Sequence, residues 1–194
     1  MRRCILFIRN ISLMPTNLRT VSLPDEIQKP GTLRTLPLGL SKEDIKTSLT
    51  SLEQVLVDSY MLYSMYKKHH WQLLGPNFYS LHLLFDKHAG EQLELIDTLA
   101  ERMQLLGGLA IAMPGDVAAR TKIESPPAGA ESWQAMITRL MDAHEKVLIA
   151  TRDGIEKTGK GDDEGTNDLL VSQVLRTNEL QLWFVSSHLG GKEN

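Results

Sequence analysis

Several features are scarce in this chain of 194 residues. It has a single cysteine, Cys4, which excludes an intrachain disulfide framework and suits a reducing compartment. Its apolar runs are all shorter than the roughly 20 residues that a membrane-spanning helix needs, so we expect no membrane span. The alternation of apolar and polar residues that is typical of strands is also missing. What is present is 42% hydrophobic residues, enough for one domain with a sizeable core.

The first 40 residues differ from the rest in charge. They hold six basic and two acidic residues, a net charge of +4, whereas the remainder holds 15 basic and 22 acidic residues, a net charge of −7. We expect a flexible arm over residues 1–40 and one domain over residues 41–191. Residues 1–13 contain a patch too short for a secretory signal, and Met14 is an alternative start. The arm is either a solubilising tail or a weak contact to DNA phosphates.

Apolar residues recur at helical spacing in four long segments. The first starts at Ser41, which forms a capping box with Asp44, and ends before the turn residues 75–77; the second follows that turn. Residues 109–130, rich in Pro and Gly, predict a crossover with one short helical turn. The third helix covers residues 131 to about 157, and the last begins at 166 or 167 and ends at the glycines 190–191. The sequence therefore predicts an all-α, ferritin-like four-helix bundle with its long connection between helices two and three.

Four potential metal ligands occupy one face of the second helix. His82 and Asp86 are four residues apart, as are Asp97 and Glu101, so each pair can hold one ion. The two pairs are about 22 Å apart along the helix axis, too far for one metal to contact both. The alternative interpretation is a set of ordinary solvated surface charges.

The numbering of the two pairs is symmetric. His82 and Glu101 add to 183, as do Asp86 and Asp97, so an antiparallel copy of the helix would bring each pair opposite the other pair of its partner. The result is two identical sites on a two-fold axis near residues 91 and 92. Gly90 lies beside this axis and permits close approach, and the same face carries the apolar residues Tyr79, Leu83, Leu93 and Ala100. No Glu-x-x-His motif, typical of sites inside a single bundle, occurs in the chain.

The first helix supplies a further candidate ligand. His70 continues its apolar stripe and flanks the same turn as His82, so both can converge on one site. Neighbouring Trp71 is either a packing residue or one that intercepts oxidising equivalents. His69 lies about 100° off the His70 face and is expected to be exposed. His88, on the core stripe, is expected to be a buried histidine with its hydrogen bonds satisfied, and His144 and His188 are candidates for additional ligands.

The run His-Trp-x-x-x-Gly-Pro-Asn-Phe at 70–78, with Leu-His-x-x-x-Asp at 81–86, Asp-x-x-x-Glu-Arg at 97–102 and Leu-Gly-Gly at 106–108, resembles the Dps family, or mini-ferritins. The resemblance covers residues 45–190. It implies a bacterial, cytoplasmic shell of twelve subunits, with nucleoid association an open alternative. Its centres at dimer interfaces would oxidise Fe(II) and store Fe(III) mineral. The ligands would be His70, His82 and Asp86 of one chain with Asp97 and Glu101 of the other.

The resemblance has further implications for the oxidant and the iron path. It implies hydrogen peroxide as the oxidant, although the sequence does not separate peroxide from dioxygen. Asp163 and Asp168 would line an acidic entry pore. Two alternatives stay open: a DNA-compacting protein with a secondary metal site, and a shell that holds Zn(II) without redox turnover, because the same ligands bind zinc. A four-helix interaction protein without either activity is the simplest fallback.

Overall fold

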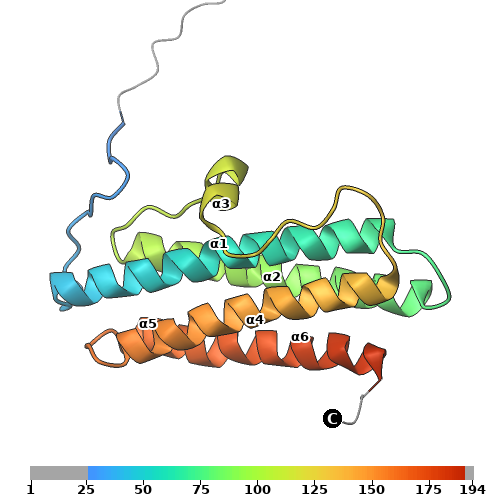
Figure 1. Ribbon diagram of the computed structural model, residues 1–194. Helices are drawn as coiled ribbons and strands as arrows, with labels where there is room; N and C mark the ends of the chain where they lie inside the picture. The colour runs from blue at the N-terminus through green and yellow to red at the C-terminus, as the bar shows by residue number, and fades with distance from the viewer. Residues whose placement is uncertain (1–25, 191–194) are drawn as a thin grey trace, which may run out of the picture.

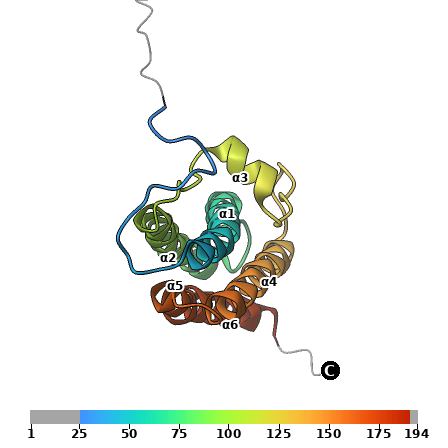
Figure 2. The same ribbon diagram turned by 90° about the vertical axis from the view of Figure 1, so that its left-hand side faces the viewer.

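The computed structural model describes residues 26–190, which form a bundle of antiparallel helices (Figure 1). The elements are α1 (Lys42–Gln72), α2 (Phe78–Leu105), α3 (Pro114–Arg120), α4 (Trp133–Thr158), α5 (Glu164–Leu169), the π-helix η1 (Leu170–Leu175), α6 (Arg176–Ser186) and the 3₁₀ turn η2 (Ser187–Leu189). Viewed end-on, α1, α2, α4 and the α5–α6 segment surround one core, with α3 outside (Figure 2). No strand occurs in residues 26–190 and the long connection lies between α2 and α4, so the predicted all-α four-helix bundle is confirmed. None of the described helices is long and apolar enough to cross a membrane.

The α1–α2 hairpin has the predicted start and turn. The Ser41 side chain accepts a hydrogen bond from the backbone N–H of Asp44 at 3.1 Å, which caps the first turn of α1. The chain leaves α1 at Leu73 in an extended conformation, and Gly75 turns it with φ = 109°. This φ lies in a region that favours glycine. The short connection places the end of α1 directly beside the start of α2.

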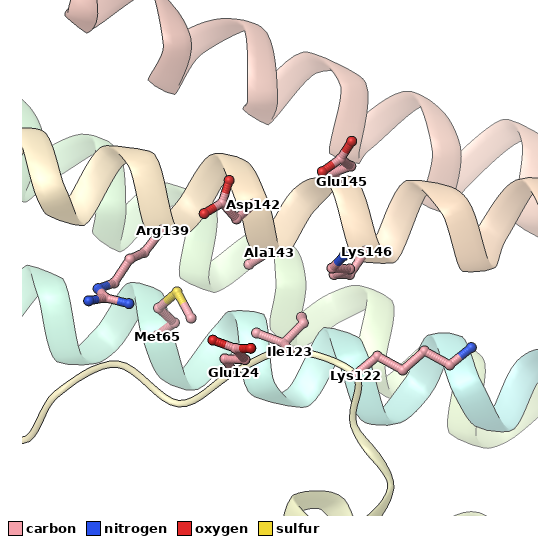
Figure 3. Close-up of a pocket in the computed structure, with 9 residues that line it drawn as sticks. All are labelled: Met65, Lys122, Ile123, Glu124, Arg139, Asp142, Ala143, Glu145 and Lys146. Atoms are coloured by element: carbon pink, nitrogen blue, oxygen red, sulfur yellow. The ribbon is translucent and has the colours of Figure 1, made fainter.

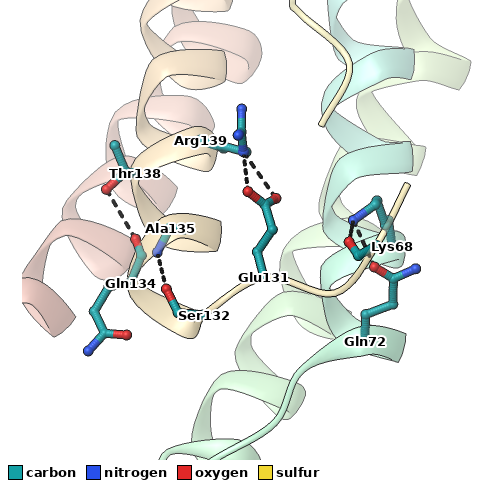
Figure 4. A network of polar contacts seen from close by, with 9 residues as sticks. Lys68, Gln72, Glu131, Ser132, Gln134, Ala135, Thr138 and Arg139 are labelled. Atoms are coloured by element: carbon teal, nitrogen blue, oxygen red, sulfur yellow. Dashed lines mark hydrogen bonds and ion pairs between the residues drawn. The ribbon is translucent and has the colours of Figure 1, made fainter. Parts of the chain in front are cut away.

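The crossover between α2 and α4 contains the expected short helix and is fixed at its far end by polar contacts (Figure 4). Glu131 accepts two hydrogen bonds from Arg139 Nε, at 2.8 and 3.0 Å. Ser132 caps α4 by accepting from the N–H of Ala135. Lys68 of α1 donates to the Gly129 carbonyl at 3.1 Å. These contacts hold the crossover against α1 before α4 begins.

The fourth helix differs from the prediction. It begins at Glu164 rather than at residue 166 or 167, because Asp163 is its N-cap and accepts from the Thr166 N–H at 3.1 Å. It is also interrupted by the π-helical stretch Leu170–Leu175, which apolar periodicity did not reveal. Gly190, with φ = 68°, ends the helical region as expected, whereas Gly191 lies outside the described residues.

The segment before α1 lies against the end of α2. Arg34 N–H and Gln28 Nε2 donate to the Gly107 carbonyl, at 2.9 and 3.0 Å. Gly107 has φ = 86°, and a Cβ there would come within 2.2 Å of the Arg34 carbonyl oxygen. Gln28 and Arg34 therefore attach part of the predicted arm to the bundle, whereas residues 1–25 of that arm lie outside the described residues.

The core runs the length of the bundle and is mostly aliphatic. Its largest fully buried side chains are Tyr66, Phe85, Leu52, Leu56, Leu62, Leu73, Leu81, Leu99, Met103, Leu106, Met136 and Ile137. Polar groups interrupt it near the middle, where Tyr66 and His144 are both fully buried. Burial at this level requires hydrogen-bond partners, and the partners come from every long helix of the bundle.

Candidate metal centre

The α1–α2 turn brings His70 and His82 into direct contact. Their rings stack with centroids 3.8 Å apart and planes 20° from parallel. His70 Nδ1 lies 2.8 Å from the carbonyl oxygen of His82, and His82 Nδ1 lies 3.1 Å from the carbonyl oxygen of His70. A carbonyl can only accept, so both Nδ1 atoms carry a proton and donate. Each histidine is thus oriented by the main chain of the other.

This pairing leaves both Nε2 atoms with a lone pair in the neutral rings. A metal-ligating histidine typically donates its other ring N–H to a carbonyl or carboxylate, which fixes its tautomer and orientation. His70 and His82 have this arrangement, and both are only partly buried. The predicted convergence of the two histidines is therefore present in a single chain, in a form suited to metal binding.

Asp86 lies next to the pair but is engaged by a lysine. Lys67 Nζ donates to Asp86 Oδ1 at 2.7 Å, and His70 Nε2 lies 3.9 Å from the same oxygen. The Lys67 hydrogen bond, followed by the charge of that lysine, holds the pKa of Asp86 below its ordinary value. This contact of Lys67 was not predicted from the sequence. The available signal was the position of Lys67 three residues before His70 and one helical turn before Trp71. A bound cation would compete with this lysine.

Asp97 and Glu101 lie further along α2 and do not join the histidines within one chain. Both are exposed on the helix surface. At 1.5 Å per residue, Asp97 is about 16 Å along the axis from Asp86. Within residues 26–190, no three His, Cys, Asp or Glu side chains are grouped to hold a metal ion. A single chain thus carries one part of the predicted ligand set near the start of α2 and the other part near its end. That the two parts meet across a two-fold axis stays a prediction.

The surface around the candidate ligands is unusually apolar for an exposed helix face. Tyr79, Leu83 and Leu93 are 74%, 51% and 51% exposed. Trp71 is 72% exposed and lies under Lys67 Nζ, which is 5.6 Å from its ring centroid. A Cβ added at Gly90 would meet nothing within 4 Å. A second helix can therefore approach this face closely.

Three of the other histidines are buried in the bundle. His69 is 0% exposed and neither ring nitrogen has a partner, so the expectation of an exposed His69 is wrong. The physical reason is that α1 packs on both α2 and α4, which buries more than one face of the helix. Burial lowers the pKa of His69 to about 4. The predicted buried and satisfied His88 is confirmed, because its Nδ1 lies 3.0 Å from the Tyr66 hydroxyl.

The proposed additional ligands lie away from the histidine pair. His144 is fully buried and contacts Tyr66 and Asn178, so its nitrogens are already used in the core. His188 lies in the 3₁₀ turn η2 that follows α6. The buried polar set around His144 includes Gln92, Asn178 and Gln181, none of which was predicted to be functional. Their occurrence on otherwise apolar helix stripes was the signal in the sequence.

The two predicted pore residues have different environments. Asp163 is 2% exposed, pairs with Arg102 and accepts from Thr166. Burial raises the pKa of Asp163, but its hydrogen bonds and the Arg102 charge outweigh this effect and lower it overall. Asp163 therefore caps α5 and does not project into solvent as a pore residue would. Asp168 is exposed, and a pore role for it stays a prediction.

A concave region of about 300 Å³ lies elsewhere, between α1, α4 and the crossover (Figure 3). Three basic and three acidic side chains line it: Lys122, Glu124, Arg139, Asp142, Glu145 and Lys146. This mixture gives no net preference for a cation or an anion. None of the predicted ligands lines it.

Comparison with known proteins agrees with this fold. The ferritin-like domain family matches residues 49–193. The structure of DpsC from Streptomyces coelicolor superimposes with a TM-score of 0.84 at 49% identity, covering 88% of this chain and 99% of that chain. Dps from Thermosynechococcus elongatus gives 0.72 at 30% identity, covering 78% and 95%. The DNA protection during starvation protein 2 of Bacillus anthracis is 28% identical over 144 residues, 74% of this chain and 97% of that protein.

These matches cover the bundle, its crossover and the helix face that carries the candidate ligands. The arrangement defines a ferritin-like protein. Within that class, the chain belongs to the Dps family.

Proposed function

We propose that this protein oxidises Fe(II) at centres shared between two antiparallel chains and stores Fe(III) inside a shell of twelve subunits. His70, His82 and Asp86 of one chain would bind iron together with Asp97 and Glu101 of the partner chain. Mixed imidazole and carboxylate ligands suit Fe(II), and the carboxylates also tolerate Fe(III). Family membership supports the class of activity.

The observation that carries the proposal is the reciprocal pairing of His70 and His82. Metal-ligating histidines typically donate their other ring N–H to a carbonyl or carboxylate, and both Nδ1 atoms here donate to main-chain carbonyls, which leaves both Nε2 atoms available to a metal. His70 Nε2 lies 3.9 Å from Asp86 Oδ1, so a carboxylate adjoins the pair. The adjoining apolar face and Gly90 support completion of the site by a second chain.

The chemistry follows from having two irons in one centre. Each Fe(II) gives one electron to hydrogen peroxide, which takes up two protons and becomes two molecules of water. This two-electron route avoids the hydroxyl radical that a single iron would release. The Fe(III) then passes into the shell interior and is deposited as an oxyhydroxide.

The first test is anaerobic loading with Fe(II) followed by a limiting pulse of peroxide. We expect consumption of about two Fe(II) per peroxide and soluble Fe(III), because each peroxide accepts two electrons. Light scattering on the same sample should give the mass of about twelve subunits, as the family resemblance implies. Metal binding without peroxide consumption would favour the zinc alternative.

Subunit mixing tests the shared centre directly. His82→Ala and Glu101→Ala should each be inactive, because each damages both centres of a symmetric dimer. In a mixed dimer, one centre would carry both substitutions and the other neither, so about half of the dimer's centres should recover. His188→Ala and Glu145→Ala are matched controls on surfaces away from α2. Exchanged subunits without recovery would contradict a centre shared between chains.

DNA binding is tested separately, because several relatives are named for DNA protection. The arm's positive charge predicts retardation of DNA that weakens with salt. Gln28 and Arg34 attach part of residues 26–40 to the bundle, so removal of residues 1–25 is the sharper deletion. Loss of retardation on this deletion, with iron oxidation intact, would assign DNA binding to the arm as an additional function.

A further inference from the structure

A second concavity lies between the N-terminal segment and the bundle. It is at the end of the α1–α2 hairpin opposite to the histidine pair, where α1 begins and α2 ends. Its volume is about 370 Å³, within the range of small-molecule sites. Three parts of the chain line it: residues 31–33, the first turns of α1, and the chain around the end of α2. A site built from such distant parts of the sequence exists only when the N-terminal segment is attached.

The α1 wall of this concavity is one face of the helix. Its residues Lys42, Lys46, Leu49 and Glu53 follow one another at intervals of three or four, so their side chains share a face. The two lysines lie at the start of this face, and Leu49 follows within one turn. The wall therefore changes from basic to apolar over a few residues, which suits a ligand with a charged head and an apolar body.

The floor of the concavity is apolar. Met103 is 2% exposed, and Leu49 and Leu109 are partly buried. A Cβ added at Gly108 would lie 2.6 Å from Leu49 Cδ2, so Leu49 packs directly on the turn that follows α2. Leu33 of the N-terminal segment, 44% exposed, adds apolar surface from the other side. Burial of this surface by an alkyl chain would be favourable, at about 0.8 kcal/mol per CH₂ group buried.

The charges at the rim of the concavity do not cancel. Glu53 is paired with Arg120, so its charge is balanced. The ammonium groups of Lys42 and Lys46 make no ion pair with any side chain in residues 26–190. Glu43 is the remaining acid, which leaves one free positive charge more than negative. A carboxylate placed between the two lysines would accept charge-assisted hydrogen bonds from both.

We propose that this concavity binds a medium-chain fatty acid. The carboxylate lies between Lys42 and Lys46, and the alkyl chain lies along Leu49 and Met103 and against Leu33. Unpaired lysines are common on exposed helices and indicate no ligand by themselves. The indication here is their position beside an apolar floor that a separate segment of the chain helps to enclose. The site is distinct from the candidate metal centre and adds ligand binding to the proposed iron oxidation.

Occupancy of the site also strengthens the attachment of the N-terminal segment. Gln28 and Arg34 hold this segment at Gly107, and Leu33 is next to Arg34 in the chain. A ligand that contacts Leu33 and α1 together binds only the attached form, so it shifts the equilibrium toward that form. Proteolysis within residues 26–40 should therefore slow by about elevenfold when the ligand is present at about ten times its dissociation constant.

The first experiment is calorimetric titration of the metal-free, full-length protein with octanoate and with octanol, which has the same chain without the charge. We expect octanoate to bind more tightly. The double variant Lys42→Gln, Lys46→Gln should weaken octanoate binding by up to about 25-fold, because each exposed ion pair contributes at most about fivefold. The same variant should leave octanol binding unchanged. Lys122→Gln, Lys146→Gln, with the same change of charge at the concavity beside α4, is the matched control and should bind octanoate like the natural chain.

The second experiment fills or opens the concavity. Thr50 is exposed and lines it, so Thr50→Trp should occupy the space and abolish binding of both octanoate and octanol. Gly107→Ala, which disturbs the attachment of the N-terminal segment, should weaken octanoate binding and remove the protection of residues 26–40 from proteolysis. Gly115→Ala should change neither. Octanoate binding that is unchanged in both the double lysine variant and Thr50→Trp would overturn the site.

Three further outcomes would also overturn the proposal. Octanoate binding that requires deletion of residues 1–25 would assign the concavity to the chain's own N-terminal residues. Binding that requires dissociation of the assembled protein would assign it to a neighbouring subunit. Binding in none of these forms would leave the concavity without a fatty-acid ligand. Neither experiment uses iron, so a negative result here leaves iron oxidation standing, and failure of iron oxidation leaves the fatty-acid site standing.

Discussion

At the scale of single residues, the least expected contact in the candidate metal centre is the ion pair between Lys67 and Asp86. The Lys67 ammonium occupies the Asp86 carboxylate that iron would need, at a distance of 2.7 Å. Asp86 is 55% exposed at the side chain, so solvent weakens this ion pair. The lysine therefore competes with a cation without blocking the site.

The substitution Lys67→Met should tighten metal binding. An exposed ion pair contributes roughly 0.2 to 1 kcal/mol, so its removal should lower the dissociation constant by at most about fivefold. Titration calorimetry with Zn(II), or with Fe(II) under anaerobic conditions, measures this constant. Lys68→Met is the control, because Lys68 bonds to Gln72 and Gly129 instead. Weaker binding in Lys67→Met would mean that the lysine assists the site.

His69 presents the opposite case, a polar side chain in the core without a partner. A buried and unpaired polar group costs roughly 1 to 3 kcal/mol, so His69→Leu should raise the free energy of unfolding at pH 7 by about 1 kcal/mol. His188→Leu, at a partly exposed site, should have little effect. Chemical denaturation measures both variants. A destabilised His69→Leu would imply that the imidazole has a partner such as a bound water.

The same residue makes stability depend on pH. The pKa of His69 falls from 6.5 to about 4 on folding, so protons favour the unfolded chain. Above pH 6.5 this titration leaves the free energy of unfolding unchanged, and as the pH falls from 6.5 toward 4 it lowers that free energy by up to about 1.4 kcal/mol per pH unit. His69→Leu lacks this loss, and its advantage over the natural chain should grow through this window. Unfolding measured at several pH values tests the slope.

At the scale of elements, Gly107 joins the N-terminal segment to the end of α2. Gly107→Ala would place a methyl group against the Arg34 carbonyl and force an unfavourable φ. We expect the free energy of unfolding to fall by about 1 to 3 kcal/mol, the usual cost of strained backbone, and proteolysis within residues 26–40 to become faster. Gly115→Ala, where space is open, is the control. Equal protease resistance in both variants would contradict the attachment.

The helices could be predicted because apolar periodicity and caps are local signals. Ser41, the turn at Gly75 and the glycine at 190 lie where the sequence placed them. The π-helix was missed because one extra residue per turn leaves little trace in a short apolar pattern. The ion pair between Asp163 and Arg102 was not predicted because the two residues are 61 positions apart in the chain. Long-range pairing of this kind is decided by packing, which the sequence pattern does not contain.

Only part of the candidate site could be predicted from the sequence. His70 and His82 were predicted to meet because a tight turn separates them, and the structure places their rings 3.8 Å apart. Asp97 and Glu101 were paired with them by a symmetry of numbering that a single chain cannot test. His69 was misjudged because a helix wedged between two neighbours buries a wider arc than a one-sided amphipathic helix. The position of His69 relative to His70 in the sequence does not show how wide an arc of α1 is buried.

At the scale of the whole molecule, we expect two chains to associate through the face around Gly90. Gly90→Ala should stabilise the single subunit by up to about 1 kcal/mol through helix propensity, because the new methyl group meets nothing. The same methyl group should weaken pairing of two chains at the predicted axis. Sedimentation and denaturation measure the two effects separately. Unchanged association would contradict a two-fold axis near residues 91 and 92. Gly115→Ala again serves as the control.

The reciprocal hydrogen bonds of His70 and His82 have a consequence for how the centre tolerates sequence change. Both acceptors are main-chain carbonyls, so these two hydrogen bonds do not require a particular side chain in the turn. Substitutions within residues 73–77 can therefore keep both hydrogen bonds, provided that the spacing of twelve residues between the histidines is kept. Insertion or deletion of one residue in the turn would instead misalign both rings at once. Mutational drift at this centre is therefore constrained by length rather than by composition.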